Sequence, residues 1–370
     1  MNSISYSLRN FSDYLANLCI FNTRTERLLN KNEKEGLINN FLSSYGSNIP
    51  VYFGYGGLGD NILLEAATEN IGRKTSLPVL VLSDYPELFI KNPYIDYVFC
   101  NIHEVRRSQG YIDFLLQLNL IPVFLPYWSR HIYKGKRTII LPYFHLVQKM
   151  SMQAGLLGNI SIVPRLYHFT TLPVSIQDAL KPPYIITQSV GKSPWKSWPT
   201  EKMQHVINEL RSRFQFVQVG LEKEPLLDNV LDLRGKLTVL QLATLMREAT
   251  LFAGNIGGLM HVARAVGTRS VIAYSSTEPL VSTGYDYNSN ILPKEPCRLC
   301  ATGALNMFLK DVCPNKYKCV TTIESVDFIA AVERLSNECK YDYIENRTIE
   351  QTISTFNPYL QYEYNAWIAS

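Results

Sequence analysis

The sequence predicts an α/β protein of two domains, each built on an open parallel sheet. Two runs of alternating strand-like and helix-like segments support this prediction, one on each side of the proline-rich stretch at residues 170–183. The length of 370 residues is sufficient for two domains that each bury a core. We therefore place the boundary between the domains in the proline-rich stretch.

The first run begins as a doubly wound sheet does, with a strand, a glycine turn, a helix and a second strand. Its segments are the strand-like 49–53, the glycine cluster 54–59, the helix-like 60–67, the strand-like 78–83 and 97–100, the helix-like 111–117 and the strand-like 121–125. This order predicts that the first sheet is parallel.

The second run restarts the same alternation after the proline-rich stretch. Its predicted strands are 184–187, 214–219, 251–253 and 270–274, and its predicted helices are 201–211, 239–248 and 261–266. Two such runs imply two similar sheets of the nucleotide-binding type that face a cleft.

Four regions follow from these patterns. Apolar residues recur at helical spacing from Leu8 to Leu18 and again from Leu37 to Leu42, which predicts helices. We therefore predict a helical N-terminal extension (1–48), an N-terminal domain (49–178), a C-terminal domain (179–345) and a tail (346–370) that packs back on the N-terminal domain.

The composition narrows the classes of function. The 36 basic and 32 acidic residues leave a formal charge of +4, without the concentrated basic runs of a nucleic-acid binder. The first residues lack the pattern of a secretion signal, and no apolar stretch is long enough to span a bilayer. We expect a cytoplasmic protein that does not bind nucleic acid, and peripheral association with the inner membrane stays open.

The glycine turn after the first strand has two interpretations. Gly54, Gly56 and Gly59 satisfy G-x-G-x-x-G, and Asp84 closes the second predicted strand, as in a dinucleotide site. An NAD(P)-dependent dehydrogenase is therefore a serious alternative. The glycines also suit a tight turn between a strand and a helix that binds nothing.

Asp60 follows the glycines at the expected helix start, where the helix dipole favours an ionised carboxylate. At the carboxyl edge of a sheet, this carboxylate is well placed to take a proton from a hydroxyl group. The simpler interpretation is a helix-capping residue.

Three segments of the second half suit a phosphate-bearing ligand. The loop after strand 184–187 carries Ser189 and Lys196, and Glu222 follows the next strand, where a carboxylate can hold ribose hydroxyls. Glycines at 257 and 258 then open a helix after strand 251–253, which makes an anion cradle from backbone N–H groups. Each residue alone also suits a solvated loop.

The same glycine segment includes Leu259, Met260 and His261 at the helix start. One helical turn in, the His261 side chain can reach a phosphate or serve only in packing. Taken by itself, His261 is better interpreted as a packing residue than as a phosphate contact.

These segments together resemble the heptosyltransferase-like glycosyltransferases, glycosyltransferase family 9 of the GT-B fold. The family's G-x-x-G-D turn, K-x-W-P loop and G-N-D-[ST]-G-x-x-H segment correspond here to Gly56–Asp60, Lys196–Pro199 and Gly254–His261. Their order and spacing match over about residues 50 to 335. The motifs are weak one by one and specific as a set.

The resemblance implies two Rossmann-like domains facing a cleft and an inverting transfer of heptose or a related sugar. It makes Asp60 the catalytic base and Lys196 a phosphate contact, and it places Glu222 and the segment Gly257–His261 around the nucleotide; we group Ser189 with them. The donor is then a nucleotide-sugar, ADP-linked in our expectation, the acceptor is a glycan or a protein, and no catalytic metal is expected.

One departure from the family pattern bears on activity. The family's usual Asp is Ile256 here, and its Ser or Thr is Gly257. The substitutions remove a carboxylate and a hydroxyl that would contact the donor, but they leave the backbone N–H groups. A non-catalytic scaffold that binds a sugar nucleotide therefore remains an alternative.

The seven cysteines predict a reduced compartment and one metal site. Cys297, Cys300, Cys313 and Cys319 form C-x2-C-x12-C-x5-C, a spacing that suits a four-thiolate structural site for zinc or iron. The alternative is four unconnected thiols. Similar clusters occur in some members of the resembled family, including those that glycosylate autotransporter proteins. Homo-oligomerisation stays open.

Overall fold

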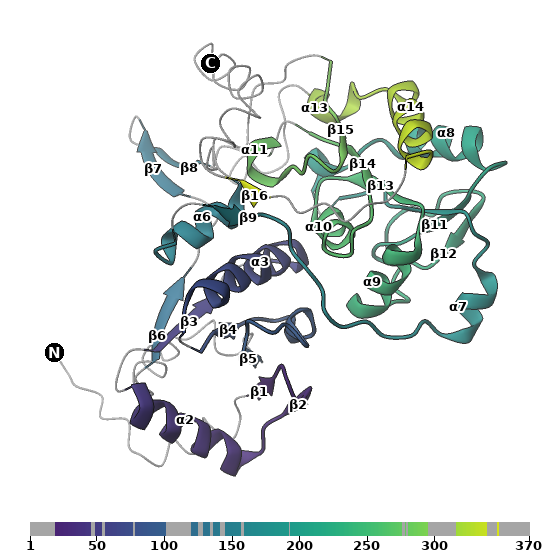
Figure 1. Cartoon of the computed structure of the whole chain (residues 1–370). Helices are drawn as coiled ribbons and strands as arrows, with labels where there is room; N and C mark the ends of the chain where they lie inside the picture. Colours follow the sequence, from purple (N-terminus) through teal and green to yellow (C-terminus); the bar gives the residue numbers. More distant parts are fainter. Residues whose placement is uncertain are drawn as a thin grey trace. The chain divides into compact units, whose positions relative to one another are not determined.

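The computed structural model shows two compact units (Figure 1). One comprises residues 1–126, 151–156 and 166–168, and the other comprises residues 127–150, 157–165 and 169–370. The structure describes residues 19–45, 49–53, 56–76, 78–100, 120–124, 129–133, 136–140, 145–156, 159–191, 193–275, 278, 280–294, 316–338 and 346–347. Among these residues, no helix is both long enough and apolar enough to cross a membrane.

The first unit is built on a six-stranded sheet with the order β2-β1-β5-β4-β3-β6. Its strands are β1 (Cys19–Asn22), β2 (Arg27–Leu28), β3 (Ile49–Phe53), β4 (Leu80–Leu82), β5 (Tyr97–Cys100) and β6 (Leu120–Phe124), and its helices are α2 (Lys31–Tyr45), α3 (Leu58–Lys74) and the 3₁₀ turn η1 (Pro86–Phe89). The strands from β3 to β6 pair in parallel, which confirms the predicted parallel sheet. The predicted helix at 111–117 lies outside the described residues.

The N-terminal region corrects the prediction of an all-helical extension. The helix is confirmed as α2, but Cys19–Asn22 forms strand β1, which pairs antiparallel with β5 and carries β2 on its other side. Ile20 of this strand is fully buried. A short apolar run does not distinguish helix from strand, and here the edge of β5 supplies backbone partners that no local pattern reveals. Residues 1–18 lie outside the described part of the chain.

The second unit contains a six-stranded sheet and the helices around it. Its strands are β7 (Ser129–Tyr133), β8 (Lys136–Ile140), β9 (Ile160–Ser161), β10 (Tyr184–Thr187), β11 (Gln215–Gln218), β12 (Val230–Asp232), β13 (Leu251–Asn255), β14 (Ser270–Ala273), β15 (Ser289–Ile291) and β16 (Asn346–Arg347). The helices are α6 (Leu146–Gln153), which begins in this unit, α7 (Val174–Ala179), η2 (Pro194–Lys196), α8 (Thr200–Leu210), α9 (Val239–Glu248), α10 (Gly258–Ala265), α11 (Leu280–Thr283), α13 (Lys318–Thr321) and α14 (Ser325–Ser336).

The large sheet of this unit has the order β12-β11-β10-β13-β14-β15, and every pair in it is parallel. Chain order therefore runs outward from β10 to one edge and then from β13 to the other, which is the doubly wound arrangement that the sequence predicts. The edge strands β12 and β15 were not predicted, because both are three-residue strands whose residues are only half-buried.

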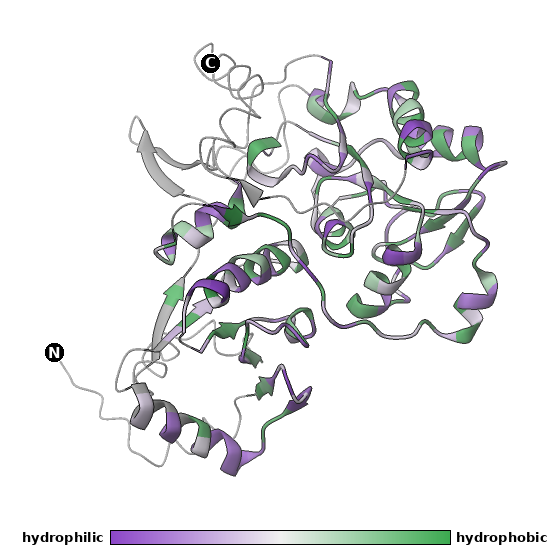
Figure 2. Cartoon of the chain, viewed as in Figure 1, coloured by the Kyte–Doolittle hydropathy of each residue, from purple (hydrophilic) through white to green (hydrophobic). Residues whose placement is uncertain are grey.

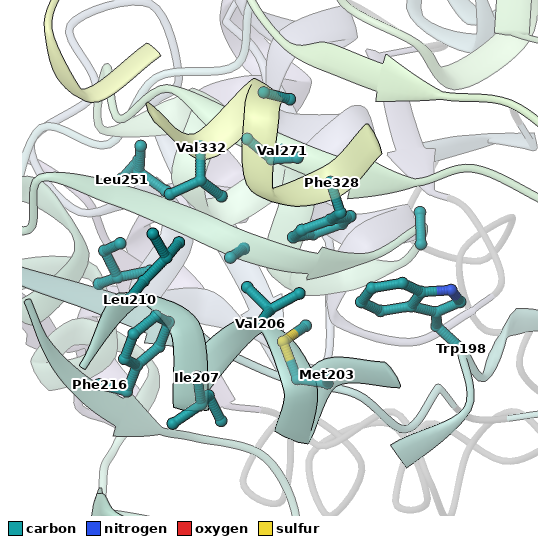
Figure 3. Packing of buried hydrophobic residues seen from close by; sticks show 14 of the residues in the cluster. Trp198, Met203, Val206, Ile207, Leu210, Phe216, Leu251, Val271, Phe328 and Val332 are labelled. Atoms are coloured by element: carbon teal, nitrogen blue, oxygen red, sulfur yellow. The ribbon is translucent and has the colours of Figure 1, made fainter. Parts of the chain in front are cut away.

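The core on one face of this sheet lies under α8 and α14 (Figure 3). Leu251 and Ala253 belong to this cluster, whereas Phe252 between them faces the other side, as alternation along a strand requires. Trp198 stacks on Phe328 of α14 with ring centroids 4.6 Å apart. Hydrophobic and hydrophilic residues interleave along α8 and α14, as expected for helices with one buried face (Figure 2).

The proline-rich stretch is held on the second unit. The Thr244 hydroxyl of α9 donates to the carbonyl of Thr170 at 2.7 Å, and the Arg247 guanidinium lies 4.0 Å from the centre of the Phe169 ring. The last change of unit along the chain falls between residues 168 and 169, just before this stretch. The start of the predicted tail forms β16, which pairs antiparallel with β9; the remainder of the tail lies outside the described residues.

Candidate functional site

The candidate site lies where the strand order of the second sheet reverses, between β10 and β13. In a doubly wound sheet the loops after these two strands separate to opposite faces, and ligands bind in the crevice at their carboxyl ends. The loops after β10, β11, β13 and β14 all begin at this edge, because the strands are parallel. They carry Ser189, Lys196, Glu222, Gly257 and Glu278.

Asn255 joins the two sides of this crevice. Its side-chain oxygen accepts from the backbone N–H of Trp198 at 3.2 Å, and its amide nitrogen donates to the carbonyl of Gln188 at 3.5 Å. Asn255 is 2% exposed, so these bonds replace water for its buried amide. The end of β13 thereby fixes the loop after β10.

The Trp198 side chain anchors the same loop in the core. Trp198 is 1% exposed, and its indole N–H donates to the carbonyl of Ile323 at 3.1 Å. The Ser197 hydroxyl further bonds to the backbone of Gly191 and Ser193. The turn that presents Lys196 is thus held at both of its ends.

Lys196 is ion-paired with Glu278 from the loop after β14. The second carboxylate oxygen of Glu278 accepts from the Thr283 hydroxyl at 3.2 Å. Burial raises the pKa of the Glu278 carboxyl. The charge and hydrogen bond of Lys196, together with other partners, lower this pKa by more than burial raises it, so the pKa lies below its usual value. Glu278 is therefore ionised at neutral pH.

His261 lies near this ion pair and is a buried, neutral histidine. His261 is 4% exposed, and its Nδ1 shares a hydrogen bond of 2.7 Å with the Tyr285 hydroxyl. Burial lowers the pKa of His261 to about 4, with Glu278 acting to raise it and Lys196 to lower it. The neutral ring supports the packing interpretation of His261 and offers no charge to a phosphate.

The turn before α10 offers backbone groups to a ligand. Gly257 has φ +152° and ψ −167°, a backbone conformation that residues with a Cβ rarely adopt. A Cβ at this position would meet no atom within 4 Å, so the backbone here is open. Ile256 and Met260 are buried, at 1% and 0% exposure, so their side chains belong to the core. Gly258 and Leu259 are half-buried. The open backbone at the start of α10 is the part of the candidate site whose geometry suits an anion.

Ser189 contributes a hydroxyl at the switch point. It is the second residue after β10 and is fully buried, and within the described part of the chain its Oγ has no hydrogen-bond partner. A buried hydroxyl without a partner costs free energy unless a ligand or water completes it. This observation supports the prediction that Ser189 belongs to a binding site.

The structure favours Glu224 over the predicted Glu222 as the ordered carboxylate after β11. Glu222 is exposed, whereas Glu224 is 8% exposed and accepts from the Gln188 amide at 3.1 Å and from the backbone N–H of Leu221 at 3.0 Å. Gly220 has φ +129°, and a Cβ there would lie 2.4 Å from the Glu224 carboxylate. Burial raises the pKa of Glu224.

Asp60 of the first unit closes the start of α3. Its Oδ2 accepts from the backbone N–H of the N-cap residue Gly57 at 2.7 Å, so Asp60 caps α3 from the third helical position and not as the N-cap residue itself. Gly56 has φ +142°, and a Cβ there would lie 1.7 Å from that carboxylate. The Asn61 side chain accepts from the Ser83 hydroxyl at the end of β4, which fixes the turn. Gly54 lies outside the described residues.

The predicted cysteine site falls mostly outside the described residues. Cys297, Cys300 and Cys313 are not among them, whereas Cys319 is 1% exposed on α13, which lies against η2. No cluster of metal-binding side chains is found within the part of the chain that the structure describes.

Sequence reasoning missed three candidate residues at this edge: Asn255, Glu224 and Glu278. Asn255 stands inside the quoted glycine segment, and Glu278 stands in the loop after a predicted strand. Both residues could have been found from the sequence, because the carboxyl ends of parallel strands lie at the same edge of the sheet. Nothing in the sequence separates Glu224 from Glu222, because the choice depends on how Gly220 turns the backbone.

Comparisons with solved structures establish the fold class. A glycosyltransferase of family 9 from Veillonella parvula DSM 2008 matches with a TM-score of 0.60 at 17% identity, over 79% of this chain and 98% of that chain. The iron-containing dodecameric glycosyltransferase TibC from enterotoxigenic E. coli H10407 matches with a TM-score of 0.59 at 15% identity, over 78% of this chain and 76% of that chain. The fold is therefore that of GT-B glycosyltransferases, as predicted.

A second structure of TibC, described as a heptosyltransferase in complex with ADP-D-β-D-heptose, matches with a TM-score of 0.52 at 12% identity, over 78% of this chain and 76% of that chain. Residues 159–302 match the profile of glycosyltransferase family 9 (heptosyltransferase). The predicted resemblance is thus confirmed over a segment that includes the whole candidate site of the second unit. A search of curated proteins found no match.

Proposed function

We propose that this chain is a glycosyltransferase that moves heptose or a related sugar from a nucleotide-sugar to a glycan or protein acceptor. The observation that supports this most is the hydrogen bond from Trp198, in the loop that carries Lys196, to Asn255, two residues before the Gly257 turn, at the switch point of a parallel sheet. A cation beside a helix N-terminus suits a diphosphate. The family match over residues 159–302 supports the same reaction class.

ADP is the proposed nucleotide. TibC, which shares this fold, has been crystallised with ADP-D-β-D-heptose. In the proposed complex, Lys196, Ser189 and the backbone N–H groups of residues 257–260 hold the diphosphate. Glu222, or the better-ordered Glu224, binds the ribose hydroxyls.

The chemistry consists of one displacement at the anomeric carbon. The acceptor oxygen attacks while its proton passes to Asp60, and the diphosphate leaves with the electron pair of the broken glycosidic bond. The groups that hold the diphosphate stabilise the charge that develops on it. A single displacement inverts the anomeric centre and needs no catalytic metal.

Replacement of Asp60 by Asn tests the base assignment. The Asn side-chain oxygen can still accept from Gly57 N–H, so we expect the fold and ADP binding to be preserved. Without a base, transfer from ADP-heptose should fall by roughly 10²- to 10⁴-fold. The assay measures transfer by mass spectrometry, with Asp84→Asn as the control that should remain active. An Asp60→Asn enzyme with full turnover would contradict the assignment.

The same variants separate the alternatives. Asp84→Asn should impair a dehydrogenase, which would bind NAD or NADP and not ADP-heptose. A non-catalytic scaffold would bind ADP-heptose without hydrolysis or transfer, an outcome that the buried Ile256 would explain. A donor that co-purifies with the protein, identified by mass spectrometry, would name the sugar and the base.

We further propose a structural metal held by Cys297, Cys300, Cys313 and Cys319. Four thiolates suit zinc or iron, and the burial of Cys319 beside η2 would let such a site brace the turn that carries Lys196. TibC is described as iron-containing, which supports iron. The metal would have no part in the reaction, because four protein ligands leave no open position.

Elemental analysis of the purified chain tests the metal proposal. We expect about one equivalent of iron or zinc per chain, and its loss in a Cys297→Ser, Cys300→Ser variant. Cys19→Ser is the control, because Cys19 lies on β1 in the other unit. Metal-free protein, or a double variant that keeps its metal, would contradict the proposal.

The proposed setting is the cytoplasm. The odd count of seven cysteines, four of them clustered late in the sequence, suits a reducing compartment better than a disulfide framework. Peripheral association with the inner membrane would bring the enzyme to a lipid-linked glycan. Assembly into a homo-oligomer is supported by the dodecameric state of TibC.

A further inference from the structure

The ion pair between Lys196 and Glu278 is not explained by the proposed chemistry. Lys196 comes from the turn after β10 and Glu278 from the loop after β14, and their side chains are 24% and 20% exposed. A carboxylate beside a diphosphate repels it, so Glu278 opposes the ligand that Lys196 would attract. Its position therefore calls for a separate function.

The two partners differ in how they are held. Glu278 uses its second oxygen to accept from Thr283, whose hydroxyl also bonds to that of Tyr274. Lys196 ends a flexible four-carbon chain, and its three N–H donors can reorient around one point. The ammonium group is thus the partner that can move, while the carboxylate stays in place.

We propose that Glu278 is the counter-ion of Lys196 in the empty site and that the diphosphate takes over Lys196 when a nucleotide binds. This inference rests on the proposed function, because it takes Lys196 as the phosphate contact. Glu278 then remains beside the phosphates and weakens their binding. It is a specificity-determining residue, since its repulsion grows with the charge of the ligand.

The charge of the ligand changes during the reaction. A nucleotide-sugar carries two negative charges on its diphosphate, and the released nucleoside diphosphate carries about one more, because its terminal phosphate is now free to ionise. Glu278 therefore repels the product more than the donor. The consequence is faster release of the nucleoside diphosphate and less inhibition by it.

Calorimetric titration of the full chain tests this inference. The ligands are ADP, ADP-glucose and inorganic pyrophosphate, and the variants are Glu278→Gln, Lys196→Ala and the double variant. Gln can still accept from Thr283, so the loop should keep its fold. Glu333→Gln is the matched control, because it removes one carboxylate from the exposed ion pair that α14 forms with Arg213, three residues after the end of α8.

We expect Glu278→Gln to bind ADP roughly fivefold to tenfold more tightly than the unaltered chain, and ADP-glucose with a smaller gain. The gain should be smaller in the Lys196→Ala background, because the competition for Lys196 is lost there while the direct repulsion remains. Glu333→Gln should change nothing. Unchanged or weaker ADP binding by Glu278→Gln would overturn the inference. An equal gain in the Lys196→Ala background would also overturn it, because Glu278 would then act without its partner.

The pyrophosphate arm separates this inference from the proposed function. If pyrophosphate follows the expected pattern but ADP does not bind, the ADP-linked donor is wrong and the counter-ion proposal stands. If ADP follows the pattern but no transfer from ADP-heptose is found, the enzyme proposal fails and the counter-ion proposal again stands. If neither ligand binds to the unaltered chain or to Glu278→Gln, the counter-ion proposal is overturned.

Discussion

At two turns, those at Gly56 and Gly220, a glycine and a nearby carboxylate together set the geometry. Gly56 leaves room for the Asp60 carboxylate to cap α3, and Gly220 leaves room for Glu224 to fold back against Gln188. In each case a Cβ would occupy the space of the carboxylate. These positions were visible in the sequence as glycines near acidic residues, but which acidic residue pairs with which glycine depends on backbone angles that the sequence does not display.

His261 allows a test at the residue scale. Its pKa is about 4 in the folded chain and near 6.5 when unfolded, so the unfolded chain binds more protons between these values. Stability is therefore lost as pH falls from about 6.5 towards 4, by up to about 3 kcal/mol. Tyr285, Lys196 and Glu278 are the groups that act on this ring.

Urea denaturation between pH 4.5 and 7.5 measures this effect. His261→Gln keeps an acceptor for the Tyr285 hydroxyl and should show a flatter pH dependence than the unaltered chain. His205→Gln changes an exposed histidine of α8 and should behave like the unaltered chain. Parallel curves for the unaltered chain and His261→Gln would show that His261 is not the neutral, buried group described.

At the scale of elements, the loop after β10 depends on Trp198. The indole packs on Phe328 and bonds to the carbonyl of Ile323, while the backbone N–H of Trp198 bonds to Asn255. The sequence suggested this residue only as part of a K-x-W-P motif. Its physical role, as the anchor of the loop that carries Lys196, depends on the packing of Trp198 against α14.

Replacement of Trp198 by Ala should destabilise the chain by about 3–5 kcal/mol, because it opens a cavity in the core. Trp198→Phe keeps an aromatic ring and loses the bond to Ile323, so we expect a cost of about 1 kcal/mol. Trp195→Ala, in the same turn but half-buried, is the control and should cost less than Trp198→Ala. Denaturation midpoints measure all three, and equal losses for the two Ala variants would refute the anchor role.

At the scale of the whole molecule, the alternation of strands and helices was sufficient to predict two parallel sheets. The prediction was correct for α8, α9 and β10 because their periodicity is strong and local. It was wrong for β1, since pairing with β5 is a contact between residues far apart in the chain. The edge strands β12 and β15 were not predicted, because a strand of three half-buried residues shows no clear alternation of apolar and polar residues.

The motifs predicted Lys196, the Gly257 turn and Ser189 as site residues. In the structure Lys196 forms an ion pair, Gly257 precedes α10, and the buried Ser189 hydroxyl has no hydrogen-bond partner among the described residues. Glu278 was not found, because its importance arises from an ion pair with a residue of another loop.

The central claim is that a nucleoside diphosphate binds at the carboxyl edge of the second sheet, between β10 and β13. Hydrogen–deuterium exchange of the full chain with and without ADP tests it most directly. We predict slower exchange in the segments 188–198 and 255–261, and no change in the segment 56–61. If ADP leaves 188–198 and 255–261 unchanged, or if NAD and not ADP slows exchange at 56–61, the account is contradicted.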